Sequence, residues 1–180
     1  MTVEWNRDGV AFRRAAGEHT HEVLGVLDEA AAWLGAKGVR QWPARFGADW
    51  VEGSIARGET WLVDVDGEPA GTFTLDWADP RWAELGGTAG YVHRLAVRRR
   101  VPGLGAVILD RAREAARERG VDALRLDCVR HNERLRAYYE GRGFVHRGDV
   151  PVDGPPGERP EDGRPAVWLS RYELALPPGA

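Results

Sequence analysis

The spacing of hydrophobic residues along the chain switches between two periods, one typical of strands and one typical of helices. Short segments with alternating or continuous apolar residues predict strands at 10–14, 60–65, 70–77, 91–97 (beginning near Ala89), 123–129, 144–147 and 167–176. Apolar residues that recur every three or four positions predict helices at 20–36, 48–56, 104–119 and 133–141. Several of these segments end at a glycine, which favours a turn.

This order of elements predicts an α/β fold with a mixed sheet. Asp66-Gly67, between two strands, is a strong hairpin signal and indicates an antiparallel meander. The later strand–helix–strand segment predicts a crossover, so helices should cover both faces of the sheet. With 180 residues we expect one domain over 1–180. Gly148 to Pro165 is rich in proline, glycine and acidic residues and is predicted to be a mobile loop.

Composition and charge narrow the classes of function. The net charge of -3 argues against a general attraction to nucleic acid. No apolar segment approaches the length of a membrane span, so we expect a cytoplasmic protein without a membrane partner. Cys128 is the only cysteine and falls in a predicted strand, which favours a buried thiol over a nucleophile.

The candidate chemistry begins where the strand ending at Val97 meets the next helix. Three arginines, 98–100, precede a Pro-Gly-Leu-Gly turn at 102–105. Free amide groups at a helix N-terminus bind anions, and the arginines add positive charge. The turn lacks the Gly-Lys-Ser/Thr of a P-loop, and Ile108 replaces the third glycine of a dinucleotide fingerprint. What remains is an Arg-x-x-Gly-x-Gly pattern.

A second pattern follows about 30 residues later. Asn132 precedes a helix that ends in Tyr139-x-x-x-Gly143-Phe144. The two patterns, with a strand between them, resemble the signatures of the GNAT N-acetyltransferase superfamily. The resemblance covers nearly the whole chain and is strongest over 91–144. It implies the GNAT acyl-CoA N-acyltransferase fold, in which a central, mostly antiparallel sheet has two splayed strands.

The resemblance also implies acetyl-CoA as the donor, direct acetyl transfer in a ternary complex and no metal. Tyr139 would serve as the acid that protonates the departing thiolate. Pro102 departs from the family pattern and removes at most one amide donor. The residues that the resemblance assigns to acetyl-CoA are Leu95, Ala96, Val97, Arg99, Arg100, Gly103, Leu104, Gly105, Ala106, Asn132 and Tyr139.

A primary amine is almost entirely protonated at neutral pH, so the reaction needs a base. We expect His93 to fill this role, because strand alternation places it on one face with Tyr91 and Leu95. Asp76 and Glu22 are weaker candidates. The expected acceptor site is Gln41, Trp42, Trp77, Tyr91 and His93, with Trp50, Trp82 and the 148–165 loop as further contributors.

The leading hypothesis is an N-acetyltransferase for a small-molecule amine. A protein N-terminal or lysine acetyltransferase is the first alternative, and a non-catalytic acyl-CoA sensor is the second. A dinucleotide-dependent enzyme is disfavoured by the missing glycine. The sequence leaves open the identity of the amine, the acyl length and whether the protein forms a homodimer.

Overall fold

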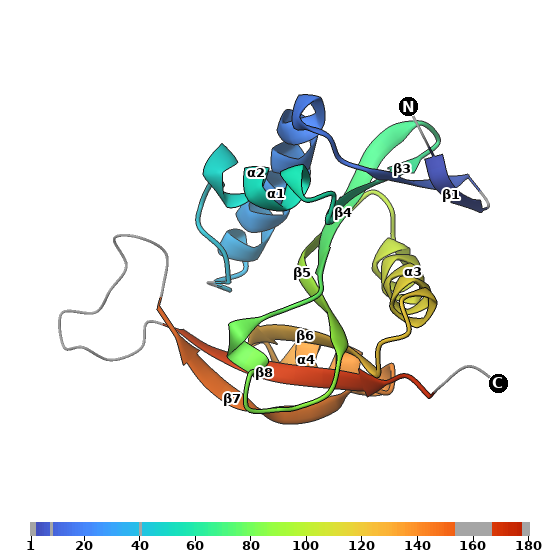
Figure 1. Cartoon of the computed structure of the whole chain (residues 1–180). Coiled ribbons are helices and arrows are strands. Elements are labelled where there is room, and N and C mark those ends of the chain that lie inside the picture. The colour runs from blue at the N-terminus through green and yellow to red at the C-terminus, as the bar shows by residue number, and fades with distance from the viewer. Residues whose placement is uncertain (1–2, 8, 40, 154–166, 178–180) are drawn as a thin grey trace.

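The structure, a computed structural model, describes residues 3–7, 9–39, 41–153 and 167–177. Within these residues eight strands form one sheet in the order β1-β2-β3-β4-β5-β6-β8-β7 (Figure 1). The strands are β1 (Val3–Arg7), β2 (Val10–Arg14), β3 (Thr60–Val65), β4 (Glu68–Asp76), β5 (Ala89–Val97), β6 (Ala123–Val129), β7 (Val145–Val152) and β8 (Val167–Ala175). The helices are α1 (Thr20–Ala36), α2 (Glu52–Ala56), α3 (Leu104–Glu118) and α4 (Glu133–Gly141), with short 3-10 turns η1 (Gly17–His19), η2 (Ala48–Trp50) and η3 (Pro80–Trp82).

Every neighbouring pair of strands is antiparallel except β5 and β6. These two strands run parallel and pair only over Ala89–Val92 and Ala123–Leu126. Beyond Val92 and Leu126 they separate and leave a gap in the middle of the sheet. The predicted mixed, mostly antiparallel sheet with splayed strands is confirmed.

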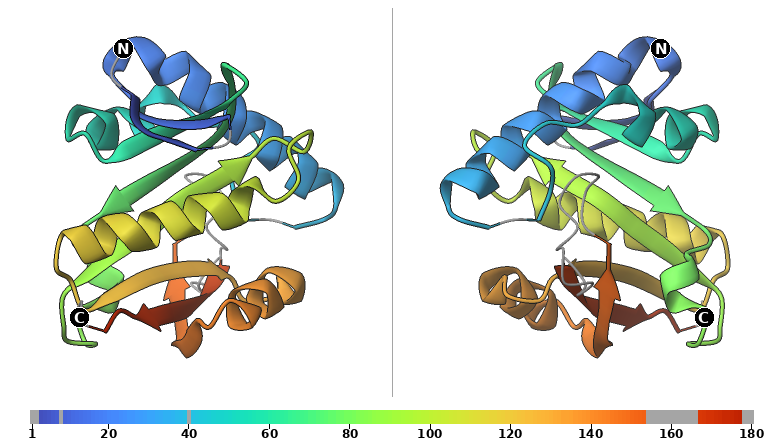
Figure 2. Two further views of the ribbon diagram at one scale, coloured as in Figure 1. Left: turned by 90° about the vertical axis from the view of Figure 1, so that its right-hand side faces the viewer. Right: turned by 90° about the vertical axis from the view of Figure 1, so that its left-hand side faces the viewer.

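The helices cover both faces of the sheet, as predicted (Figure 2). On one face α3 and α4 bury the larger core, in which Ile108, Ala112 and Ala116 are fully excluded from solvent. On the other face α1 and α2 bury a second core around Val26, Leu27 and Leu62. Apolar burial of this kind is the main stabilising term of the fold. Among the described residues, no helix has the length and apolar character needed to cross a bilayer.

The structure corrects the prediction of a loop that begins at Gly148. Residues 148–152 belong to β7, which pairs with β8. Gly148 has φ 94° and lies where the register shifts between His146 and Asp149, so it forms a bulge. Pro151 is tolerated because β7 is at the edge of the sheet. Residues 154–166 of the predicted loop lie outside the described residues.

Two further differences are local. The predicted helix over 48–56 is split into η2 and α2 by Val51, whose backbone (φ -121°) leaves the helical region. Strand β1 was not predicted at all, and it pairs with β2 at the opposite edge of the sheet.

Candidate active site

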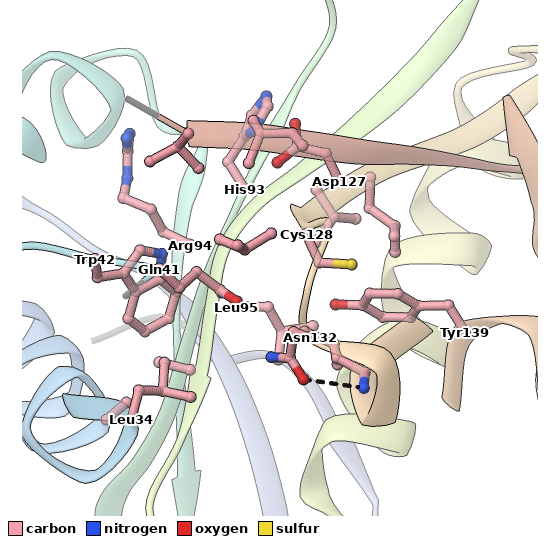
Figure 3. Close-up of a pocket in the computed structure, with 18 of the residues that line it drawn as sticks. Leu34, Gln41, Trp42, His93, Arg94, Leu95, Asp127, Cys128, Asn132 and Tyr139 are labelled. Carbon is pink, nitrogen blue, oxygen red and sulfur yellow. Dashed lines mark hydrogen bonds between the residues drawn. The ribbon is translucent and has the colours of Figure 1, made fainter. Parts of the chain in front are cut away.

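A cavity of about 800 Å³ opens where β5 and β6 separate. Its walls come from α1, the 41–50 segment, η3, the two splayed strands and α4 (Figure 3). Cavities of this size, mostly apolar with a few polar groups, are typical of ligand sites. The gap in the sheet is therefore the candidate active site.

A bulge in β5 changes which face of the sheet its side chains occupy next to this cavity. Residues 72–74 of β4 face residues 93–96 of β5, so β5 contains one extra residue. Arg94 takes up the irregularity with φ 49°, which is uncommon for a residue other than glycine. The bulge shifts the alternation, so Leu95 packs against the α3-side core together with Val97. The expectation that Leu95 shares a face with Tyr91 and His93 is wrong for this reason.

Tyr139 projects from α4 into the gap. Its side chain is 7% exposed, and burial raises the pKa of its hydroxyl above the usual value. The hydroxyl points towards the part of the cavity lined by Cys128 and Asn132 (Figure 3). It makes no hydrogen bond with the residues that the structure describes. It is thus a protonated donor aimed at the position of a ligand.

Asn132 and Cys128 lie beside Tyr139. Asn132 caps α4, and its Oδ1 accepts a hydrogen bond of 3.2 Å from the Leu135 amide, as its sequence position predicted. Cys128 is 1% exposed, and burial raises the pKa of its thiol to about 12. The prediction of a buried thiol is confirmed, and the raised pKa disfavours the thiolate that nucleophilic attack requires.

The predicted turn forms at the start of α3. Gly103 is the N-cap residue and has φ 84°, a left-handed conformation that favours glycine. The amides of the first helical turn lack partners within the helix and face outward. Arg99 lines the cavity and stacks on Trp33 at 4.1 Å, whereas the exposed Arg100 donates to the Pro69 carbonyl.

The residues assigned to acetyl-CoA divide into two groups. The first group lines the cavity: Leu95, Ala96, Val97, Arg99, Gly105, Asn132 and Tyr139. The second group, Arg100, Gly103, Leu104 and Ala106, belongs to the turn or its helix and does not line the cavity. Leu104 is buried under the helix, and the Ala106 amide donates to the Gly103 carbonyl, so only the backbone of this turn is presented to a ligand.

His93 lines the cavity but is surrounded by charged groups. Its Nε2 lies 3.4 Å from Asp79 Oδ2 and 3.5 Å from Asp76 Oδ2, and its Nδ1 lies 3.5 Å from an Arg81 nitrogen. Because arginine only donates, Nδ1 is the acceptor and Nε2 carries the hydrogen. Burial, reinforced by the charge of Arg81, lowers the pKa of His93 to about 4. The lone pair of this neutral imidazole faces Arg81.

Asp79, His93 and Asp127 place one ligand atom each within 4.8 Å of one another. Arg81 lies among them, with one nitrogen 3.2 Å from Asp79 and 3.9 Å from Asp127. A guanidinium that is always charged already supplies the cation that this group requires. Arg81 therefore supplies the positive charge in this group, and we identify no metal ligands among these three side chains. The expectation of a metal-free site stays a prediction.

The other two candidate bases differ in position. Asp76 lines the cavity, and burial together with a hydrogen bond to Glu59 raises the pKa of Asp76 to about 6. Glu22 does not line the cavity and is bound to the buried Arg13. Sequence reasoning missed Asp127, although a carboxylate inside a strand of otherwise buried residues was a usable signal.

Part of the predicted acceptor site lies in the cavity. Gln41, Trp42 and Trp50 line it, and both indoles pack edge-on against Phe46 at 5.6 and 5.5 Å. The side-chain oxygen of Gln41 is buried without a hydrogen-bond partner, so a ligand N–H could bind there.

The other aromatic residues that were predicted to form the acceptor site lie outside the cavity. Trp77 packs against the α3-side core beneath Arg119. Tyr91 and Trp82 form a separate small core, where the Tyr91 hydroxyl accepts a hydrogen bond from Arg125. The structure does not bring these three side chains into the cavity.

Comparison with known proteins agrees with this geometry. Residues 27–144 match the family described as acetyltransferase (GNAT) family. The uncharacterized N-acetyltransferase YesJ of Bacillus subtilis is 32% identical over 152 residues, which are 78% of this chain and 84% of that protein. Mycothiol acetyltransferase of Beutenbergia cavernae is 31% identical over 144 residues, which are 72% of this chain but only 46% of that protein.

A solved structure shows the same fold. A GNAT-family acetyltransferase from Listeria monocytogenes superimposes with a TM-score of 0.72 over 98% of this chain and 99% of the other. The two sequences are 24% identical, so this likeness concerns the fold alone.

Proposed function

This chain belongs to the GNAT acetyltransferase family and is an acetyl-CoA-dependent acetyltransferase, and on that premise we propose that it acetylates a primary amine of a small molecule. The transfer would be direct, within a ternary complex of enzyme, acetyl-CoA and amine. The observation that carries the proposal is the cavity between the splayed strands, with a protonated Tyr139 on one side and an aromatic pocket on the other.

The backbone around the gap is suited to acetyl-CoA. After Val92, β5 has no partner on the β6 side, so the pantetheine arm can bond its main chain as an added strand would. Leu95 and Val97 would contact this arm. The turn at Gly103 and Gly105 would hold the pyrophosphate through amides at the start of α3, and Arg99 would add charge.

Tyr139 would act on the departing sulfur. A free tyrosine has a pKa of about 10 and a thiol about 8.5, and burial raises the pKa of Tyr139 further. Full transfer of its proton to the thiolate would therefore be uphill. Its contribution would come from a hydrogen bond that strengthens as charge develops on the sulfur, which is the form of stabilisation that accelerates a reaction.

The form of the cavity favours a small acceptor over a protein. Trp42, Phe46 and Trp50 line the cavity with packed rings, and Gln41 offers a single buried oxygen. An extended peptide would need an open groove at this position. A protein acetyltransferase remains the alternative that the test below addresses.

The test begins with thermal unfolding in the presence of acetyl-CoA, NADH or ATP at equal concentrations. A ligand at 100 times its Kd adds about 2.7 kcal/mol, which corresponds to roughly 5–11 °C for a chain of this size. We expect this shift with acetyl-CoA alone. A larger shift with NADH would overturn the assignment of the turn.

The second step measures thiol release from acetyl-CoA with a panel of small primary amines and a panel of peptides. We expect the best small amine to have a higher kcat/KM than any peptide. Faster transfer to peptides would replace the small-molecule proposal with the protein alternative.

A further inference from the structure

We propose that Asp127, rather than His93, is the general base that takes a proton from the ammonium group of the acceptor. This inference rests on the proposed function and adds a catalytic residue that sequence reasoning did not find. It is carried by the position of Asp127 at the opening of the gap and by the lack of a hydrogen bond to one of its oxygens.

Asp127 lies where the two strands begin to separate. It directly follows Leu126, the last residue of β6 that pairs with β5, and its side chain lines the cavity. Its neighbour Cys128 packs in the core that also holds Tyr139. Figure 3 shows Asp127 next to His93, with Cys128 between it and the Tyr139 hydroxyl, so the proposed base and the proposed donor lie on opposite sides of Cys128.

The electrostatic surroundings agree with this proximity. After burial, the negative charge of Asp127 is the next cause that raises the pKa of Cys128. The same charge also contributes, behind burial and Cys128, to the raised pKa of Tyr139. Asp127 is therefore one of the charged groups that surround Cys128 and Tyr139.

One oxygen of Asp127 has an ion-pair neighbour but no hydrogen bond. Its Oδ2 is buried and makes no hydrogen bond with any residue that the structure describes, which is uncommon for a buried polar atom. The charged groups that face it are Arg81 and Asp79 from the η3 segment, His93 from β5 and Arg171 from β8. Arg81 lies at 3.9 Å, beyond hydrogen-bond distance, and its guanidinium bonds to Asp79 instead. Arg171 bonds to Glu84 and to the Arg81 carbonyl.

The other candidate bases in the cavity also lie beside charged groups. The acceptor nitrogen of His93 faces Arg81. Asp79 accepts hydrogen bonds from the backbone and the side chain of Arg81. Asp76 also has a buried oxygen, Oδ1, without a hydrogen bond to the described residues, but this oxygen lies 3.7 Å from an Arg57 nitrogen and the other oxygen lies 3.5 Å from His93 Nε2. Asp153 also lines the cavity, but its residue is exposed to solvent, where a carboxylate is a weak base.

The proposed step conserves atoms and charge. The Asp127 carboxylate takes one proton from the ammonium group and becomes a neutral carboxylic acid. The amine nitrogen then attacks the thioester carbonyl, and the bond to sulfur breaks as the amide bond forms. The nitrogen loses its second proton, the sulfur gains one to give CoA thiol, and Asp127 releases its proton to solvent. Burial raises the pKa of Asp127 above that of a solvated carboxylate, which makes it a stronger base.

The test compares two acceptors of nearly equal size, methylamine and hydroxylamine. Methylamine is protonated at pH 7 and needs the base, whereas hydroxylamine is already largely neutral. Thiol release from acetyl-CoA is measured with both probes for wild type, Asp127→Asn and His93→Gln. Asp66→Asn, in the β3–β4 turn outside the cavity, is the matched control, because its φ of 53° suits asparagine.

We expect Asp127→Asn to lower the methylamine rate about 100-fold, the usual contribution of a general base, and the hydroxylamine rate less than about threefold. His93→Gln should lower both rates by the same factor, because it disturbs Arg81 without removing the base. The ratio of the two rates does not depend on how much of a variant is folded. An unchanged ratio in Asp127→Asn, or a changed ratio in His93→Gln alone, would overturn the proposal.

The affinity for acetyl-CoA separates this test from the test of the proposed function. Wild type and Asp127→Asn should bind acetyl-CoA with the same Kd in calorimetry. Failure of wild type to bind would refute the acetyl-CoA site itself. Equal binding with an unchanged rate ratio would refute only the role of Asp127.

Discussion

The hydroxyl of Tyr139 is buried in the gap of the sheet and remains protonated because burial disfavours the phenolate. A protonated donor can stabilise a thiolate only through a hydrogen bond that forms as the carbon–sulfur bond breaks. The ring itself packs against Phe144 and Tyr172 at 5.8 and 5.9 Å. The packing and the proposed chemistry of this residue therefore reside in different atoms and can be separated by substitution.

Tyr139→Phe keeps the ring and removes the donor. We expect kcat for the best acceptor amine to fall about 100-fold, while the Kd for acetyl-CoA changes less than about twofold. Steady-state kinetics and calorimetry give the two values. A parallel change of Kd and kcat would mean that Tyr139 binds acetyl-CoA and does not act on the leaving group.

At the level of elements, the start of α3 contains two glycines that differ in backbone conformation and in their position relative to the cavity. Gly103 precedes the helix in a left-handed conformation, and a Cβ there would meet no atom within 4 Å. Gly105 lies in the first helical turn without a positive φ, and a Cβ there would meet only the Tyr138 hydroxyl at 3.9 Å. Gly105 lines the cavity, whereas Gly103 does not. One glycine shapes the turn and the other keeps the approach to it open.

This difference predicts opposite effects on stability. Gly103→Ala should lower the free energy of unfolding by about 1–2 kcal/mol, because alanine is strained at positive φ. Gly105→Ala should raise it by up to about 1 kcal/mol, because alanine favours the helix, yet it should weaken acetyl-CoA binding by filling the approach. Denaturant unfolding and calorimetry measure both effects. Unchanged acetyl-CoA affinity in Gly105→Ala would contradict the assigned path of the cofactor.

In the whole molecule, the sheet separates two cores that must be held in register for the gap to keep its shape. Arg13, 3% exposed, connects the sheet with the α1 side. Its Nε lies 2.7 Å from Asp64 on β3, and another nitrogen pairs with Glu22 on α1. This network holds Glu22 against Arg13 and outside the cavity. In this network the buried carboxylate of Asp64 forms its ion pair with Arg13.

Arg13→Met should therefore lower the free energy of unfolding by about 3–5 kcal/mol, since Asp64 would remain buried without its partner. The double variant Arg13→Met/Asp64→Leu removes both charges and should recover at least half of this loss. Chemical denaturation of both proteins measures the difference. A double variant less stable than Arg13→Met would show that the pair contributes more than it costs.

Local sequence patterns predicted most of the elements and the turn that precedes α3. These features depend on local rules: the apolar period of α3, the left-handed glycine at 103, the Asn132 cap and the position of Tyr139 on α4. Each rule involves residues only a few positions apart, and one chain is enough to apply it. The same reasoning correctly predicted that Cys128 is buried.

The electrostatic environment of the cavity, and the set of side chains that line it, depend on tertiary packing. The bulge at Arg94 changed the face of Leu95, and edge pairing with β8 turned residues 148–152 into a strand. The group formed by Arg81, His93 and Asp127 comes from η3, β5 and β6, up to 46 positions apart (127 − 81). Burial and charge at such a meeting point depend on the packing of distant segments, which no local period contains.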